Sequence, residues 1–236
     1  MNLRILTSND IPAIATIHLM AFPRAAVSRL GRGAARRYYD SLMSGRYGTV
    51  GLGAFEQDQL SGFCFVGVRH SAEIFYVRRH ALFLAWRIMT HPWLLTEAFI
   101  CDRIRSGLRL LLPRSRRPIT GAPAGENSQC SYGIQYLAVD PSCQGHGVGK
   151  QLLRASEEIA RQQGCVEIHL SVYLDNSKAI GLYEQMGWRK ISSDGVWRGL
   201  MFKRLAKAGS ADVPSLRVNR TQPGLKDNAC IRGRAL

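Results

Sequence analysis

The sequence lacks the cysteine spacings that stabilise small secreted domains or bind zinc. Its six cysteines include no CxxC pair and no close grouping with histidine, so we expect neither a disulfide framework nor a metal site. It also lacks an uncharged apolar run of about 18 residues, so no transmembrane segment is expected. The opening MNLRILTSND turns polar at Thr7, which predicts no signal peptide and a cytoplasmic location.

Acidic residues are scarce. Only 17 Asp and Glu stand against 32 Lys and Arg, which leaves a formal net charge of +15. Such a charge favours anionic partners, among them nucleotides, nucleic acids and membrane head groups, and says nothing about the fold. With 236 residues, 46% of them apolar, the chain is long enough to bury a full hydrophobic core.

Hydrophobic periodicity predicts strands and helices on both sides of an unusual middle segment. The expected strands cover residues 3–6, 49–55, 60–68, 132–139, 165–172, 188–192 and 195–205. The expected helices cover residues 7–22, 34–43, 147–163 and 176–187. Ser8 or Asn9 is expected to cap the first helix, with Pro12 in its first turn.

The middle segment, residues 70–128, is basic and apolar. Its pattern from 73 to 112 is helical with a break at Pro92, and the rest has the composition of a loop. Ten arginines stand between residues 69 and 118 against three acidic residues. We predict a basic helical insertion between the third and fourth strands, and a disordered basic tail over residues 206–236.

The stretch SCQGHGVGKQLLRA places three glycines within five residues at the start of a predicted helix. It is either a plain linking turn or a nest of backbone N–H groups that binds a phosphate. A dinucleotide site would need an acid at the end of the next strand, CVEIHLSV, and none is there. A P-loop would need Ser or Thr after its lysine, whereas Lys150 precedes Gln151.

Two sequence blocks in order resemble the GNAT family of N-acetyltransferases. The first block is matched by Gln144, Gly147 and Gly149, and the second, NSKAIGLYEQMGW, by Asn176, Ala179, Tyr183, Gly187 and Trp188. The resemblance implies an α/β fold with a mixed, mostly antiparallel twisted sheet and helices on both faces. The resemblance covers about residues 1–70 and 130–205 and does not account for the insertion or the tail, so we expect an N-acetyltransferase domain over residues 1–205 with an insertion at 70–128.

The resemblance also implies acetyl-CoA as co-substrate, with no metal. Backbone N–H groups of the nest would bind its pyrophosphate, and the end of the strand 132–139 would lie beside the thioester. Asn176 would contact the CoA arm. The implied cofactor-binding residues are Leu137, Ala138, Val139, Gln144, Gly145, His146, Gly147, Val148, Gly149, Lys150 and Asn176.

Tyr183 is the side chain that the resemblance implies as general acid, returning a proton to the departing thiolate. Its helical spacing with Ile180 and Met186 would equally suit a core tyrosine. The general base is open. Family members carry glutamates where this chain has Gly133 and Ser171. Glu167 and His169 share a strand face with Ser171 and are candidates, beside a water chain or an amine that arrives neutral.

Three acceptor classes remain open. A small primary amine, such as an amino sugar or an amino acid derivative, suits an insertion that forms a lid over the acceptor. A protein N-terminus or lysine is the alternative. The third is no enzyme but a nucleic-acid or membrane-surface binder on the same fold. The basic insertion and tail also predict weak polyanion contact. Because the insertion's aromatic residues Phe83 and Trp86 recur at helical spacing, we expect them to be buried.

Overall fold

The computed structural model describes residues 1–44, 48–68, 76–77, 79–90 and 132–205. Seven strands form one sheet in the order β1-β2-β3-β4-β5-β7-β6. Every pair of neighbouring strands is antiparallel except β4 and β5, which are parallel. The predicted mixed, mostly antiparallel sheet is therefore confirmed.

The strands are β1 (Asn2–Ile5), β2 (Val50–Glu56), β3 (Gln59–Val68), β4 (Tyr132–Val139), β5 (Glu167–Ser171), β6 (Arg189–Ser193) and β7 (Val196–Arg204). The helices are α1 (Ile11–Ala21), α2 (Ala26–Arg29), α3 (Arg32–Met43), α5 (Ala81–Thr90), α7 (Val148–Gln162) and α8 (Ser177–Gln185), with 3-10 turns η1 (Ser8–Asp10) and η3 (Pro141–Cys143). Every strand and helix predicted on either side of the middle segment is present, and only the short α2 was not expected.

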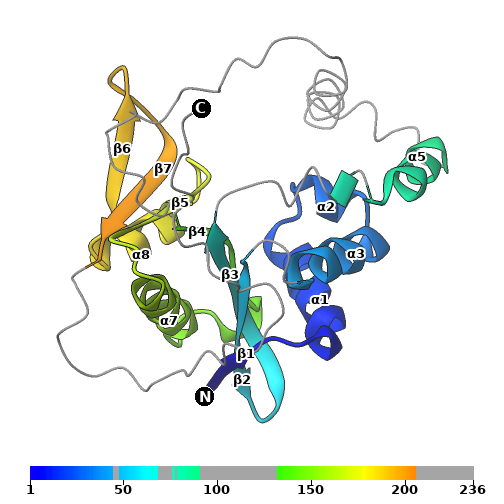
Figure 1. Cartoon of the computed structure of the whole chain (residues 1–236), viewed down its shortest axis with the longest axis horizontal. Helices are drawn as coiled ribbons and strands as arrows, with labels where there is room; N and C mark the ends of the chain where they lie inside the picture. The colour runs from blue at the N-terminus through cyan, green and yellow to red at the C-terminus, as the bar shows by residue number, and fades with distance from the viewer. Residues whose placement is uncertain (45–47, 69–75, 78, 91–131, 206–236) are drawn as a thin grey trace, which may run out of the picture.

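Helices cover both faces of the sheet, with α1 and α3 on one side and α7 and α8 on the other (Figure 1). The amphipathic α7 buries Leu152 and Ile159 against the sheet, where they meet Ile168 of β5. On the opposite face, Ile14 of α1 and Tyr39 of α3 are buried in a second cluster. The sheet is thus the middle of three layers.

The insertion begins between β3 and β4, where it was predicted, with α5 as its described helix. Residues 91–128 and the predicted tail lie outside the described residues. The expected burial of Trp86 is wrong for α5. This helix packs through Phe83, whose ring lies 4.1 Å from the Arg37 guanidinium, and through Leu84, whereas Trp86 faces outward.

The N-terminal cap also differs from the prediction. Thr7 is the N-cap of the turn η1, and Asp10 is the N-cap of α1 itself, so neither Ser8 nor Asn9 caps the helix. The Asp10 carboxylate accepts from the Thr7 amide at 2.7 Å and pairs with both Arg4 guanidinium nitrogens at 2.7 and 2.8 Å. The Arg4 hydrogen bonds are the main cause that lowers the pKa of Asp10 to about 2. This carboxylate fixes the passage from β1 into α1.

His18 of α1 is fully buried in an aromatic cluster. Its Nδ1 lies 2.6 Å from the Tyr39 hydroxyl, and its ring packs against Phe22 and Tyr136. Nε2 is buried without a hydrogen-bond partner among the described residues. Burial lowers the pKa of His18 to about 4, because the charged ring would lose its hydration. His18 is therefore neutral in the folded protein near neutral pH.

This burial predicts a pH-dependent stability. An unfolded histidine titrates near pH 6.5, so between about pH 6.5 and pH 4 the unfolded chain binds a proton that the folded chain does not. The stabilisation from a neutral His18 is present above pH 6.5 and is lost as the pH falls towards 4. Going from pH 7 to 4.5 should cost about 2 kcal/mol through this residue. Urea unfolding of the wild type and of His18→Leu should show a shallower pH dependence in the variant; parallel curves would contradict the assignment.

Candidate functional site

The strand β4 loses one of its two neighbouring strands halfway along its length. It pairs with β5 only over Tyr132–Ile134, while its pairing with β3 continues to Val139. An extra residue, Gln135, interrupts the β3 register, because Phe65 pairs with Tyr136 and Val66 pairs with Ile134. Past this bulge, the backbone of β4 has no strand partner on its β5 side within the described chain. Two parallel strands therefore separate and leave strand amides available.

The bulge also sets which β4 side chains face each layer. Leu137 and Val139 pack against the α7 cluster, and Ala138 is buried in the cluster of α1 and α3. All three residues predicted to lie beside the thioester therefore turn their side chains into the layers. A ligand between β4 and β5 would therefore contact the backbone of β4 rather than these side chains.

The predicted nest lies at the N-terminus of α7, just beyond the end of β4. The first helical hydrogen bond runs from the Gln151 amide to the Gly147 carbonyl at 3.1 Å. Within the described residues, no carbonyl or side chain accepts from the amides of Val148, Gly149 or Lys150. These three donors, with the positive end of the helix behind them, form a site for an anion.

The glycines of the nest have the backbone conformation that this site needs. Gly145 and Gly147 have φ values of +86° and +81°, and a Cβ added to either would meet nothing within 4 Å. The space in front of the amides is therefore open. Gly149 differs, because its Cβ would lie 3.5 Å from Leu182 of α8 and 3.7 Å from Val139. A Cβ at Gly149 would thus make ordinary van der Waals contacts with α8 and the end of β4.

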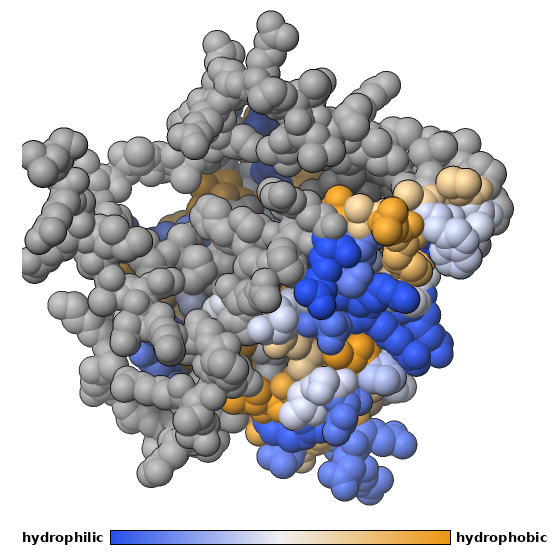
Figure 2. All heavy atoms as spheres, turned by 45° about the vertical axis from the view of Figure 1, so that its right-hand side comes forward, coloured by the Kyte–Doolittle hydropathy of each residue, from blue (hydrophilic) through white to orange (hydrophobic). Residues whose placement is uncertain are grey.

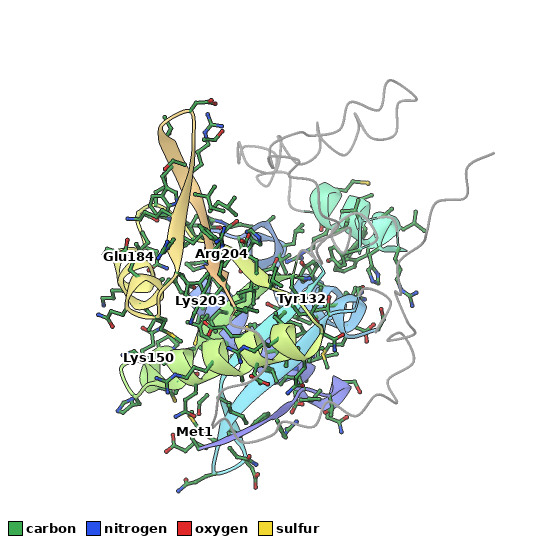
Figure 3. The ribbon with its side chains drawn as sticks, turned by 60° about the vertical axis from the view of Figure 1, so that its left-hand side comes forward. Met1, Tyr132, Lys150, Glu184, Lys203 and Arg204 are labelled. Carbon is green, nitrogen blue, oxygen red and sulfur yellow. The ribbon has the colours of Figure 1, made fainter. Side chains whose placement is uncertain are left out.

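The side chains of the nest differ in their exposure to solvent. Val148 is buried, while His146 and Lys150 are exposed, and Lys150 projects from the first turn of α7 (Figure 3). Gln144 donates from Nε2 to the Val139 carbonyl at 3.3 Å and so ties the loop to the strand end. The side chain of His146 is exposed to solvent, as expected from the sequence. We assign it no role as a base.

Tyr183 lies on α8 in the same packed cluster as Leu137, Val139 and Cys64. Only 8% of its surface is exposed, and burial is the main cause that raises the pKa of its hydroxyl, with the neighbouring Cys64 thiol second. No described residue hydrogen-bonds this hydroxyl, which nevertheless keeps contact with solvent. Because Cys64 is the cross-strand partner of Leu137, the phenol lies near the strand end where β4 and β5 part. Tyr183 therefore packs in the core while its hydroxyl keeps contact with solvent, and its role as general acid stays a prediction.

A buried carboxylate of α7 that the sequence reasoning missed, Glu157, binds Trp188, which follows α8, and Lys203 of β7. Glu157 accepts from Trp188 Nε1 at 3.1 Å and from Lys203 Nζ at 2.7 Å. The Trp188 ring in turn lies 6.1 Å from the ring of Tyr183. The sequence signal was an acid on the apolar side of α7, four residues after Leu153. This network fixes the position of Tyr183.

Asn176 has a structural role at the start of α8. It is the N-cap of this helix, and its Oδ1 accepts from the Ala179 amide at 3.1 Å. The side chain therefore orients α8 at the mouth of the opening between β4 and β5. Contact between Asn176 and a CoA arm stays a prediction.

The two candidate bases lie at the other end of β5. Glu167 Oε1 lies 2.9 Å from His169 Nε2, and His169 stacks on Phe202. His169 is level with Gly133 on the neighbouring strand, four residues before Leu137. At about 3.3 Å per residue, that places it roughly 13 Å from the strand end, and Glu167 farther still. Their role as bases stays a prediction that this register does not favour.

An ion pair spans the opening from the opposite side. Arg24, in the loop between α1 and α2, donates to the Asp175 carboxylate at 2.9 Å in the loop between β5 and α8. Both side chains are exposed, so the pair contributes little to stability. Sequence reasoning could not find it, because 151 residues separate its partners.

A shallow pocket of about 240 Å³ lies next to the nest, between Cys143, His146 and Glu56 of the β2–β3 hairpin. The Glu56 carboxylate disfavours an anion there. In the described residues no cluster of His, Cys, Asp and Glu could hold a metal ion.

Comparison with known proteins agrees with this geometry. Residues 116–188 match the model of the acetyltransferase (GNAT) family. Mycothiol acetyltransferase of Saccharomonospora viridis is 33% identical over 82 residues, which are 35% of this chain and 24% of that protein. N-alpha-acetyltransferase RimI of Mycobacterium tuberculosis is 29% identical over 99 residues, 42% of this chain and 56% of that protein. The chain thus spans between about a quarter and just over half of these relatives.

Solved structures share the fold at low sequence identity. Ribosomal-protein-alanine N-acetyltransferase from Brucella melitensis has a TM-score of 0.52 at 16% identity and covers 87% of this chain and 100% of its own. PaiA N-acetyltransferase from Thermoplasma acidophilum, solved in complex with coenzyme A, has a TM-score of 0.50 at 15% identity and covers 86% and 99%. Residues 116–188, which include the glycine nest and Tyr183, thus match a GNAT acetyltransferase domain, and the solved acetyltransferases share the fold of the described chain.

Proposed function

We propose that this protein transfers an acetyl group from acetyl-CoA directly to a primary amine. The observation that carries the proposal is the combination of an unsatisfied helix N-terminus with two parted parallel strands and a buried phenol next to them. Acetyl-CoA, an acetyl thioester on a long arm that leads to a pyrophosphate, suits all three. The nest suits the anion, the strand amides suit the arm, and Tyr183 suits the leaving thiolate.

The amides of Val148, Gly149 and Lys150 would bind the pyrophosphate, with the exposed ammonium of Lys150 adding attraction. The open space in front of Gly145 and Gly147 fits such a group, since any Cβ there would occupy it. The backbone of β4 beyond Gln135, which has no strand partner on its β5 side in the described chain, would bind the extended arm. One N–H of this backbone aimed at the acetyl carbonyl would stabilise the negative charge that develops there, an effect of about 3 kcal/mol.

Tyr183 would supply the proton that the departing thiolate needs. Burial raises the pKa of its hydroxyl, so the phenol keeps its proton throughout the physiological range. The proton that the amine loses has no assigned acceptor, because Glu167 and His169 lie away from the strand end. A water molecule in the opening, or an amine that arrives neutral, would complete the transfer.

For the acceptor we propose a small primary amine. The support is the Arg24–Asp175 pair across the opening, which leaves less room for an extended polypeptide than for a compact molecule. The relatives include a mycothiol acetyltransferase and an N-alpha-acetyltransferase, whose names indicate different acceptors. Sequence similarity alone therefore does not identify the acceptor of this chain. A peptide acceptor would require this pair to open.

A panel of acceptors tests the proposal. Acetyl-CoA is offered with amino sugars, amino acid derivatives, peptides with free N-termini and lysine-containing peptides, and released thiol is measured with mass spectrometry of the amine. We expect thiol release matched by acetylation of a small amine. Faster turnover of peptides, particularly if Arg24→Ala raises it further, would replace the small acceptor by a polypeptide. Thiol release that no amine accelerates would reject amine transfer.

A further inference from the structure

The outer surface of α5 carries apolar side chains that the proposed acetyl-transfer site does not use. Leu82, Trp86 and Met89 recur at helical spacing, and 89%, 56% and 80% of their surfaces are exposed. Large apolar residues gathered on one exposed helix face mark an interaction site rather than an ordinary surface. Figure 2 shows apolar side chains in this region directly beside strongly hydrophilic ones.

The contacts of α5 fix this orientation. Phe83 lies against the Arg37 guanidinium of α3, and Arg87 donates from Nε to the Leu30 carbonyl at 3.0 Å. Leu84 packs against the buried cluster of α1 and α3. The inner side of α5 is therefore occupied, and turning Trp86 inward would break all these contacts.

The surface around this apolar stripe is basic. Residues 24–44 and the described residues of 76–90 hold seven arginines and a single acid, Asp40. Arg32 and Arg36 are exposed on the outer side of α3, the helix on which α5 packs. An exposed apolar stripe on a helix, with arginines beside it, has the make-up of a helix that lies in a membrane interface.

We propose that the outer faces of α5 and α3 form a docking surface for an anionic lipid membrane. Leu82, Trp86 and Met89 would enter the boundary between head groups and acyl chains, and the arginines would contact the lipid phosphates. The binding is peripheral: none of the helices in the described ranges is long and apolar enough to cross a membrane. This surface is separate from the nest and the parted strands, so the proposal does not depend on the acetyl-transfer chemistry.

Other occupants fit these residues less well. Single-stranded nucleic acid binds to several aromatic side chains in a basic groove, whereas Leu82 and Met89 offer nothing to a base or a phosphate. A second copy of the chain in a two-fold dimer would bring the same arginines face to face, which is unfavourable. A lipid surface satisfies both the apolar stripe and the positive charge.

The full-length chain should bind vesicles that contain about 30% phosphatidylglycerol in phosphatidylcholine, at physiological salt, and not vesicles of phosphatidylcholine alone. Replacing Leu82 and Trp86 together by alanine should lower the partition coefficient about tenfold or more, and so should Arg32→Glu with Arg36→Glu. Sedimentation of vesicles measures the coefficient. All these side chains are exposed, so melting temperatures should change little.

The β6–β7 hairpin provides matched controls at the opposite side of the molecule (Figure 1). Val196, 54% exposed, and Arg198, also exposed, are replaced by Ala and Glu, and neither change should alter vesicle binding. An equal loss of vesicle binding in the control variants would mean that binding does not depend on the surface of α5 and α3, and it would overturn the proposal. It would also be overturned by absent vesicle binding, by preference for DNA of the same charge, or by a dimer in sedimentation velocity that Trp86→Ala dissociates.

Discussion

Replacing Tyr183 by phenylalanine is expected to lower kcat for acetyl transfer by about 10²- to 10⁴-fold, with the affinity for acetyl-CoA nearly unchanged. The change removes a hydroxyl that no described residue hydrogen-bonds, so packing against Trp188 and the cluster around Cys64 should survive. If the hydroxyl donates the proton to the leaving thiolate, its removal should slow only the chemical step and leave acetyl-CoA binding unchanged. Steady-state kinetics with a saturating amine, together with calorimetric titration of acetyl-CoA, separate the two effects.

Tyr39→Phe is the matched control for this prediction. Tyr39 is also buried, but its hydroxyl hydrogen-bonds His18 in the cluster of α1 and α3, away from the nest. The control should lose stability, by about 1 kcal/mol or more, and keep kcat. An active Tyr183→Phe enzyme would make Tyr183 a core residue alone, and a Tyr39→Phe enzyme with an equal loss of kcat would show that tyrosine packing, not proton donation, limits the rate.

Gly147→Ala should weaken acetyl-CoA binding by about 10- to 100-fold. Its Cβ would occupy the open space in front of the amides of Val148, Gly149 and Lys150, and so would hold a phosphate away from two or three charge-assisted hydrogen bonds. The change also forces alanine into a left-handed conformation at a φ of +81°, which costs about 1–2 kcal/mol of folding stability. Calorimetric titration gives the affinity, and thermal unfolding gives the stability.

Gly164→Ala separates these two effects. Gly164 follows the other end of α7, with a φ of +76° and no atom within 4 Å of an added Cβ, so its backbone strain matches that of Gly147. Both variants should lose similar stability, but only Gly147→Ala should lose acetyl-CoA. Normal binding by a folded Gly147→Ala protein would mean that the anion binds elsewhere.

Much of the fold could be predicted because its signals are local. The period of α7, the alternation along β4 and the positive-φ glycines of the nest are each contained in a short stretch of sequence. The N-cap of α1 was mispredicted by one or two residues. Ser8 and Asn9 are good caps by residue type, but the position is taken by Asp10, whose carboxylate is held by Arg4 of the preceding strand and by the Thr7 amide.

The site could be predicted only in part. The nest of backbone amides could be predicted, because glycines at positions 145 and 147 indicate a backbone conformation that other residues rarely adopt. Features made by distant residues were not: the Arg24–Asp175 pair, the Glu157 network and the bulge at Gln135 each depend on how separate elements pack. The helical spacing of Phe83 and Trp86 predicted a shared buried face, but the 4.1 Å contact of Phe83 with Arg37 turns α5 so that Trp86 is left outside.

The most direct test of acetyl-CoA binding at this site is the melting temperature of the full chain as acetyl-CoA is added. A ligand that binds only the folded protein at 100 times its dissociation constant stabilises it by about 2.7 kcal/mol. For a domain of this size that corresponds to a rise of roughly 5–10 °C, which should continue with the logarithm of the acetyl-CoA concentration. The account predicts this rise in the wild type and its loss in Gly147→Ala. A melting temperature that does not move up to millimolar acetyl-CoA would contradict it.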